Sequence, residues 1–302
     1  MKEKHKFSVV IPVYNEEGIL RESIEALVKN VSAITEFDLE YEIIICENGS
    51  YDNTHQIAKQ LTEELPAIRV EHLKYPSYGE AMKLGISAAV HEKIIIFNID
   101  FWDMEFLKKT MVLLDEYDCI VGSKVIEGAV DGRPLLRRLI TKGFNLFLRL
   151  IYGFKGTDTH GIKGFRRSSI YPVSMQCLTD REIFDTELLL RADRAKLLIY
   201  ELPVTIQEIR MPRLKLLRRI PSTARDLFRL YIALQFKPVI TLNAPRYEQQ
   251  SLKDISLLKT YQKIKILGDR LTPNEISFVT EIPLATVREL QEIMRMESDR
   301  NE

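Results

Sequence analysis

The sequence predicts an α/β fold, in which a mostly parallel β-sheet has helices on both faces and is followed by a small C-terminal helical appendage. Short apolar runs alternate with amphipathic helical patterns through the first third of the chain. The runs are continuously apolar rather than alternating, which is typical of parallel strands that are buried on both faces. Polar or glycine-bearing segments follow these runs. Because ligands of such sheets bind beyond the carboxyl ends of the strands, the sequence predicts a ligand site at that edge.

The elements follow one another regularly as far as residue 100. The β-branched run Phe7–Val13 predicts the first strand, and the periodic segment from Glu16 to Val31 predicts the helix after it. The same alternation predicts further strands over 41–46, 67–73 and 92–99, with helices within 50–65 and over 78–90. The pattern changes after residues 119–124, "CIVGSK". It continues with a basic, aromatic helix over 135–154, a loop over 157–169, a helix around 181–196, a strand-like run over 197–206 and a basic segment over 208–236.

Net charge, cysteine content and the length of apolar runs indicate which class of protein this is. The 43 basic and 43 acidic residues balance, so net charge does not favour a nucleic-acid partner. The three cysteines are odd in number and set among apolar residues, which predicts buried thiols in a reducing compartment. The apolar run near the start is too short for a signal peptide, and no uncharged apolar run is long enough to span a bilayer. We therefore expect a cytoplasmic protein without a transmembrane helix, and peripheral attachment at the inner membrane face stays open.

Several motifs together resemble a known family. The segments "SVVIPVYNEE", "ENGSYDNT", "GEAMKLGISAA", "NIDF" and "FDTELLLRADRAKLLIYELPV" occur in the order typical of a family-2 glycosyltransferase with a GT-A (Rossmann-like) fold. Within that family the chain resembles the dolichyl-phosphate or polyprenyl-phosphate sugar synthases. The resemblance implies a hexosyltransferase that uses a nucleoside-diphosphate sugar with Mg²⁺ or Mn²⁺. It implies a GT-A domain over 1–240, with a nucleotide-sugar half at about 1–125 and an acceptor half at about 126–240, and leaves 241–302 as a linker and small helical appendage.

The resemblance assigns the ends of the first two strands to the nucleotide. Pro12 and Tyr14 would form one wall of a planar pocket, and Glu16 would accept from a ribose hydroxyl or the base. Glu47 stands where the family has an acidic residue that reads the base, and the usual pair of aspartates is replaced here by Glu47 and Asn48. A buried carboxylate suits the N–H edge of uracil or guanine, because an acceptor that faces donors is selective. Glu16 equally suits the first turn of a helix, so both interpretations stay open.

The stretch "NIDFWD" stands at the Asp-x-Asp position of the family. Asp100 matches the second aspartate and Asn98 replaces the first, so the resemblance implies these two as ligands of the cation. Mg²⁺ and Mn²⁺ prefer oxygen ligands and are commonly held by one or two carboxylates together with phosphates. Asp103 offers a further carboxylate, but its position before "MEFL" favours an N-cap over a metal ligand.

Two cations match family residues that lie near the diphosphate. Lys124, in "GSK", replaces an arginine of the family, and Arg210 follows "ELPVTIQEI". The resemblance implies that both stabilise the departing diphosphate and thereby act in catalysis. For the arginines that follow in the basic segment, a solvated basic face is the favoured interpretation.

The loop "DTHGIKGFRR" resembles the acceptor loop of the family, although it is one residue shorter than the usual form. The resemblance implies that Asp158 and His160 orient the acceptor and that Lys163 and Arg166 hold its phosphate. Asp185, in "FDTEL", stands where many family members keep the general base. A phosphate acceptor is already anionic and needs no base, so the role of Asp185 stays open.

Two further segments each allow two interpretations. The basic, aromatic segment Leu135–Phe154 fits an amphipathic helix at a membrane surface, and it equally fits a helix that packs on its own sheet. The tail "RLTPNEISFVTEIPLATVRELQEIM" predicts two short helices similar to a helix-turn-helix. Its acidic second helix argues against nucleic acid and favours a packing role or a homodimer through these helices.

The motifs together favour an inverting, metal-dependent transferase that moves a sugar from a nucleoside-diphosphate sugar to an acceptor, with a polyprenyl phosphate as the leading candidate. Two alternatives remain. Asn98 and the Glu47–Asn48 pair motivate a nucleotide-sugar-binding regulatory protein that has lost turnover. A transferase that acts on a soluble acceptor is the second alternative. The sugar and the base of the donor stay open.

Overall fold

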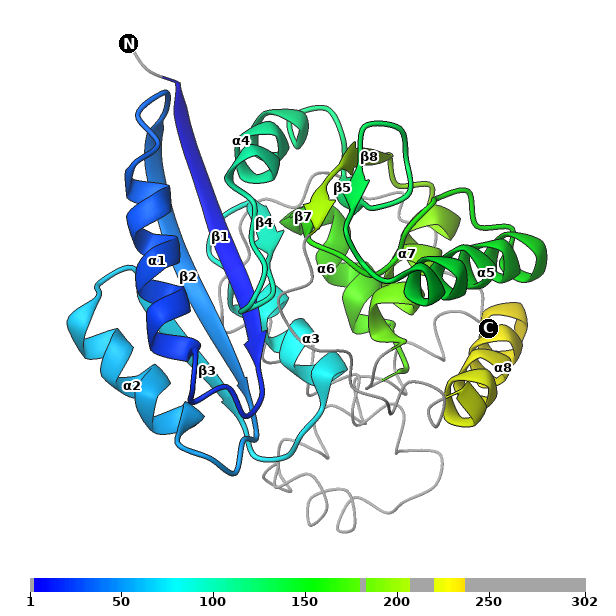
Figure 1. Ribbon diagram of the computed structural model, residues 1–302, viewed down its shortest axis with the longest axis horizontal. Coiled ribbons are helices and arrows are strands. Elements are labelled where there is room, and N and C mark those ends of the chain that lie inside the picture. Colours follow the sequence, from blue (N-terminus) through cyan, green and yellow to red (C-terminus); the bar gives the residue numbers. More distant parts are fainter. Residues whose placement is uncertain (1–2, 180–182, 207–219, 237–302) are drawn as a thin grey trace, which may run out of the picture. The chain divides into compact units, whose positions relative to one another are not determined.

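The computed structural model describes residues 3–179, 183–206 and 220–236, and its main element is a seven-stranded sheet. In chain order its strands are β1 (Lys4–Val13), β2 (Asp38–Asn48), β3 (Ile68–Leu73), β4 (Lys93–Ile96), β5 (Cys119–Ser123), β7 (Lys163–Arg166) and β8 (Ile199–Pro203). Their order across the sheet is β3-β2-β1-β4-β7-β5-β8 (Figure 1). Every neighbouring pair is parallel except the two that contain β7. The predicted mostly parallel sheet is confirmed.

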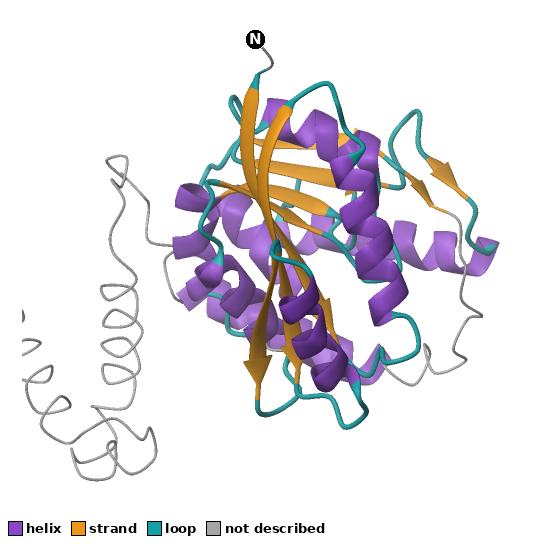
Figure 2. Ribbon diagram, turned by 90° about the vertical axis from the view of Figure 1, so that its left-hand side faces the viewer, coloured by secondary structure: helices purple, strands orange, loops and turns teal. Residues whose placement is uncertain are grey.

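Helices cover both faces of this sheet (Figure 2). They are α1 (Leu20–Ser32), α2 (Thr54–Glu64), α3 (Tyr78–Ala88), α4 (Met104–Leu113), α5 (Leu135–Tyr152), α6 (Arg167–Met175), α7 (Phe184–Arg194) and α8 (Ile220–Phe236). Successive strand residues point to opposite faces, so Val9 and Ile11 join one core with α1, α2 and α4. Val10 joins the other core, which contains residues of α3, α6 and α7 and, farther along, of α5 and α8. The continuous apolar runs are thus buried on both sides, as predicted.

Strand β7 lies inside the segment predicted as a loop, and that part of the prediction was wrong. Its register places Lys163 beside Ile96 of β4 and Val121 of β5, with Arg166 beside Lys93. The strand therefore runs antiparallel between two groups of parallel strands. A run of four residues with two basic side chains has no apolar periodicity, so local sequence carries no signal for it. Hydrogen bonds to both neighbours decide its conformation. A small second sheet pairs β6 (Val130–Asp131) with β9 (Thr205–Ile206).

Close packing beneath the strand ends requires glycine at two positions. Gly49 follows β2 with φ at +65°, and a Cβ there would lie 2.7 Å from the carbonyl carbon of Tyr75. Gly85 lets α3 approach the sheet, because a Cβ would lie 2.6 Å from the Sγ of Cys46. All three cysteines are buried free thiols, and burial raises their pKa values, so the prediction of buried thiols is confirmed.

Two predictions concern residues outside the described ranges. Arg210 and the linker and helical appendage of residues 241–302 belong to that part of the chain. Among the residues that are described, no helix is both long enough and apolar enough to cross a bilayer.

Candidate functional site

The carboxyl ends of β1 and β2 lie side by side, because their register pairs Val13 with Glu47. The turns that follow these strands are linked by hydrogen bonds. The backbone N–H of Asn15 donates to Ser50 Oγ at 2.9 Å, and the N–H of Tyr51 donates to Asn15 Oδ1 at 3.0 Å. The structure thereby brings together the residues predicted for the nucleotide, namely Pro12, Tyr14, Glu16, Glu47 and Asn48.

The residues at this edge differ in how they are held. Tyr14 is 41% exposed and can offer its ring to a ligand, whereas Glu47 is fully buried. Glu47 Oε1 accepts from the N–H of Ser50 at 2.6 Å, and Oε2 contacts His72 Nδ1. Asn48 Oδ1 accepts a hydrogen bond from the backbone N–H of Ser77, the N-cap of α3, at 2.6 Å. Both oxygens of Glu47 therefore have protein partners, and its assignment to the base stays a prediction.

The proposed metal ligands lie on a tight turn after β4. The backbones of Asn98 and Phe101 exchange two hydrogen bonds at 3.2 Å, which places Ile99 and Asp100 at the tip. Ile99 is buried, and its carbonyl accepts from the hydroxyl of Ser23, so the turn is anchored. The side chains of Asn98 and Asp100 are exposed at the same edge as the ends of β1 and β2. An anchored, exposed carboxylate and amide suit a cation that is shared with a ligand.

Asp103 does not share this role with Asp100. It is the N-cap of α4, and its Oδ1 accepts from the N–H groups of Glu105 at 2.8 Å and Phe106 at 3.0 Å. These two bonds satisfy free donors of the first helical turn. The N-cap interpretation of Asp103 is confirmed.

A buried ion pair follows the end of β5. Lys124 Nζ lies 2.9 Å from Asp158 Oδ2, and the two side chains are 6% and 2% exposed. The ammonium also donates to the carbonyl of His160, while the N–H of His160 donates to Asp158 Oδ1 at 3.0 Å. Burial lowers the pKa of Lys124, although the carboxylate of Asp158 opposes this shift. The loop that precedes β7 is thus held against β5 by charge.

A second buried pair lies at the start of β7. Lys163 Nζ lies 3.3 Å from Asp185 Oδ1 and donates to the carbonyl of Gly161 at 2.7 Å. The hydroxyl of Tyr78 donates to Asp185 Oδ2 at 3.0 Å. Burial, with the nearby carboxylate, raises the pKa of Tyr78 well above its usual value, so the phenol stays a donor. Tyr78 was missed from the sequence, since only the fold brings α3 to α7.

His160 faces a cavity beside these pairs. Its Nδ1 lies 2.9 Å from Thr159 Oγ1, and its ring meets that of Phe144 edge to face at 5.7 Å. His160 lines this cavity, and desolvation by the surrounding protein atoms lowers its pKa.

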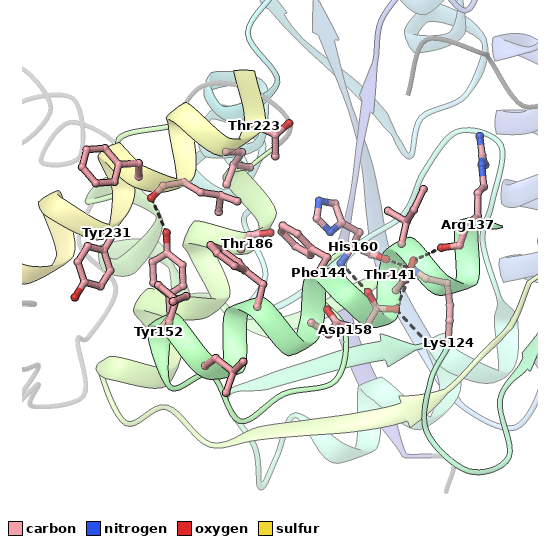
Figure 3. Close-up of a pocket in the computed structure, with 18 of the residues that line it drawn as sticks. Lys124, Arg137, Thr141, Phe144, Tyr152, Asp158, His160, Thr186, Thr223 and Tyr231 are labelled. Carbon is pink, nitrogen blue, oxygen red and sulfur yellow. Dashed lines mark hydrogen bonds and ion pairs between the residues drawn. The ribbon is translucent and has the colours of Figure 1, made fainter. Parts of the chain in front are cut away.

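The cavity has a volume of about 1050 Å³ and lies between α5 and α8. Figure 3 shows Lys124, Asp158 and Arg137 at one end and Tyr152 and Tyr231 toward α8 at the other. Apolar side chains make up much of the wall between them, including Ile140, Phe144, Phe147, Leu150, Ile151 and Leu227. The arrangement gives one charged end and one long apolar end, which suits an amphiphilic ligand.

Arg166 is not brought to this cavity. It lies at the far end of β7, beside the first residue of β4, and its guanidinium donates to the carbonyls of Leu114 at 2.9 Å and Asp115 at 3.0 Å. The structure places Asp158, His160 and Lys163 at one edge of the sheet and Arg166 at the other. The expected phosphate contact of Arg166 therefore has no support from its position.

Known proteins agree with this architecture. The family description "Glycosyl transferase family 2" matches residues 8–173, more than half of the chain. "Glycosyltransferase AglD" of Haloferax volcanii is 27% identical over 303 residues, which cover 95% of this chain and 48% of that protein, so the chain spans about half of its length. A "dolichyl-phosphate beta-glucosyltransferase" of Dictyostelium discoideum is 27% identical over 239 residues, or 74% of this chain and 73% of the relative.

A solved structure shows the same fold. Glucosyl-3-phosphoglycerate synthase from Mycobacterium tuberculosis, in complex with Mn²⁺, UDP and glucosyl-3-phosphoglycerate, superposes with a TM-score of 0.55 at 16% identity, over 76% of this chain and 79% of that chain. The GT-A-like sheet is thereby confirmed, and the dolichyl-phosphate relative agrees with the branch that the motifs resemble. The predicted glycosyltransferase class is confirmed, and the chain belongs to glycosyl transferase family 2.

Proposed function

We propose that this protein transfers a sugar from a nucleoside-diphosphate sugar to a polyprenyl phosphate, with inversion at the anomeric carbon. The observation that carries the proposal is the cavity, whose apolar walls end at Lys124 and His160. A polyprenyl phosphate has the same division, with an anionic head and a long apolar chain. The dolichyl-phosphate relative supports the same class of acceptor.

The donor belongs at the ends of β1, β2 and β4. Asp100 and Asn98 fit Mg²⁺ or Mn²⁺, because one carboxylate and one amide oxygen on an anchored, exposed turn leave most of the coordination to phosphates and water. When bound, such an ion neutralises the charge that develops on the departing diphosphate. The Mn²⁺ in the complex of the structural neighbour is consistent with this assignment.

The cations that line the cavity act on the acceptor side, so Lys124 is assigned here to the acceptor phosphate instead of the departing diphosphate. Arg137 provides positive charge for the acceptor phosphate, together with Lys124 and Arg133, which are paired with Asp158 and Asp131. Asp185 is held between Lys163 and the hydroxyl of Tyr78, so it positions these groups. A phosphate monoester is already a nucleophilic anion, and the transfer then requires no proton acceptor.

The surface of α5 supports attachment to a membrane. Leu135 is 72% exposed and Leu139 is 65% exposed, and Arg138 and Lys142 are exposed on the same helix. An amphipathic helix with exposed leucines and cations binds anionic lipid surfaces. Because α5 also lines the cavity, this attachment would present the cavity to a lipid acceptor.

A donor screen tests the proposal. Radiolabelled nucleotide sugars are incubated with the full chain, polyprenyl phosphate and Mn²⁺ or Mg²⁺, and label in the organic phase is counted. We expect metal-dependent label with one donor. Label on an aqueous acceptor alone would support the soluble-acceptor alternative, and donor binding without any turnover would support the regulatory alternative.

Replacing Asp100→Ala tests the metal assignment. Because the variant loses the charged ligand of the cation, we expect kcat to fall by at least about 100-fold, the cost of removing one group that stabilises a developing charge. Asp103→Asn is the matched control, since asparagine is an equally good N-cap and should leave kcat unchanged. Full metal-dependent turnover in Asp100→Ala would contradict the assignment.

A further inference from the structure

Glu47, His55 and His72 form a cluster whose two histidines have no role in the proposed transfer reaction, while Glu47 is also the residue predicted for the base of the donor. Among the described residues, their ligand-type atoms all lie within 4.8 Å of one another. His72 Nδ1 contacts Glu47 Oε2, and His55 Nδ1 lies 3.6 Å from the same oxygen. The two imidazole rings are 4.3 Å apart between centroids. Two nitrogen donors thus converge on one carboxylate.

Three different elements hold this cluster in place. Glu47 is near the end of β2, His72 is its direct neighbour in the register of β3, and His55 is in the first turn of α2. Glu47 is fully buried and is fixed by the N–H of Ser50 on its other oxygen. The carboxylate is therefore already oriented before any ligand arrives, which lowers the cost of binding.

The set of donors selects a particular class of cation. Two imidazoles and one carboxylate suit zinc and related first-row ions, whereas Mg²⁺ prefers oxygen ligands throughout. Zinc bonds of about 2.0–2.2 Å place tetrahedral ligands roughly 3.3 Å apart, close to the separation between His55 and Glu47. Both histidine side chains are 46% exposed, so an ion can enter and a fourth position faces solvent.

We propose that Glu47, His55 and His72 form a binding site for one zinc ion, separate from the cation site at Asp100. The ion would join β2, β3 and α2 immediately behind the turn that contains Gly49 and Ser50. That turn is hydrogen-bonded to the β1–α1 turn on the donor side, through Ser50 and Asn15. The bound ion would thus cross-link three elements beneath the edge of the sheet where the nucleotide is predicted to bind.

Zinc titration of the full chain tests the site. Protein stripped with a chelator is titrated with Zn²⁺ by calorimetry in excess Mg²⁺, and bound zinc is measured by atomic emission. We expect one zinc per chain and a higher unfolding temperature with zinc. In His72→Gln and His55→Gln the affinity should fall by at least about 100-fold, because even residues that only support a ligand are worth about 10- to 100-fold.

Control variants distinguish zinc binding at this cluster from binding at other histidines or at Asp100. His91→Gln removes a histidine outside the cluster and should bind zinc as the parent does. Asp100→Ala should also keep its zinc, which distinguishes this site from the donor cation. Cobalt gives a second readout, since its visible absorption in this site should be lost in His72→Gln. Absence of stoichiometric zinc in the parent, or unchanged affinity in both cluster variants, would overturn the proposal.

Discussion

Lys124 and Asp158 place two opposite charges almost out of reach of solvent. Taking both ions out of water is costly, and the pair is tolerated because backbone N–H groups also donate to Asp158. The pairing could not be deduced from the sequence, in which the two residues are far apart. The family resemblance implied a functional role for both residues, but only the structure shows that they form an ion pair with each other.

Asp158→Asn should lower the free energy of unfolding by about 3 kcal/mol, because it leaves the ammonium of Lys124 buried without its counter-ion. Urea unfolding followed by circular dichroism measures the loss. Glu40→Gln is the control, since Glu40 pairs with Lys4 and Lys6 at the surface and should cost less than about 1 kcal/mol. Equal losses in the two variants would show that the buried pair has no special role.

Helices α5 and α8 form the walls of the cavity and are joined by Tyr152. Its hydroxyl donates to the carbonyl of Leu227 at 2.6 Å, and its ring packs edge to face with Tyr231 at 6.0 Å. Desolvation raises the pKa of Tyr152 to about 12. The contact was not predictable, because apolar periodicity indicates which side of a helix is buried but not which helix covers it.

Tyr152→Phe should cost about 1 kcal/mol of stability at pH 8, through the lost hydrogen bond. The parent should also weaken as the pH rises from 10 to about 12. Unfolded tyrosine loses its proton near pH 10 while folded Tyr152 keeps it, so high pH favours the unfolded state. In the Tyr152→Phe variant the free energy of unfolding should fall less steeply with pH than in the parent. The difference is at most about 1.4 kcal/mol per pH unit, the contribution of one titrating group.

Urea unfolding at pH 8, 10 and 11 measures both effects. Tyr75→Phe serves as the control, because that side chain is 70% exposed and should change neither stability nor slope. A parent and a Tyr152→Phe variant with the same alkaline slope would refute the linkage.

For the molecule as a whole, α5 provides both a wall of the cavity and an exposed apolar surface. Leu148 and Tyr152 are buried in the core, while Leu135 and Leu139 face solvent. Both interpretations of this segment therefore find support, since one side packs on the protein and another is free for a bilayer. A protein that takes a lipid acceptor gains from such a surface, because the acceptor does not leave the membrane.

The double variant Leu135→Asp and Leu139→Asp should bind anionic vesicles at least about tenfold more weakly, because two leucines can no longer enter the interface. Sedimentation with phosphatidylglycerol vesicles measures binding. Val90→Asp is the matched control on another surface, where the side chain is 60% exposed. Undiminished vesicle binding by the double variant would remove α5 from membrane attachment.

The sequence by itself determined the elements whose signal is local. Continuous apolar runs predict strands covered on both faces, and polar strand ends predict a ligand site at the carboxyl edge, because both signals depend on residues that are close in the chain. The tertiary structure alone decided the place of β7, the contact of Tyr78 with Asp185, and the cluster of Glu47 with His55 and His72. Each of these depends on which distant segments the sheet brings together. Pairing across strands and helices is a property of the packed chain, and no periodicity within one segment encodes it.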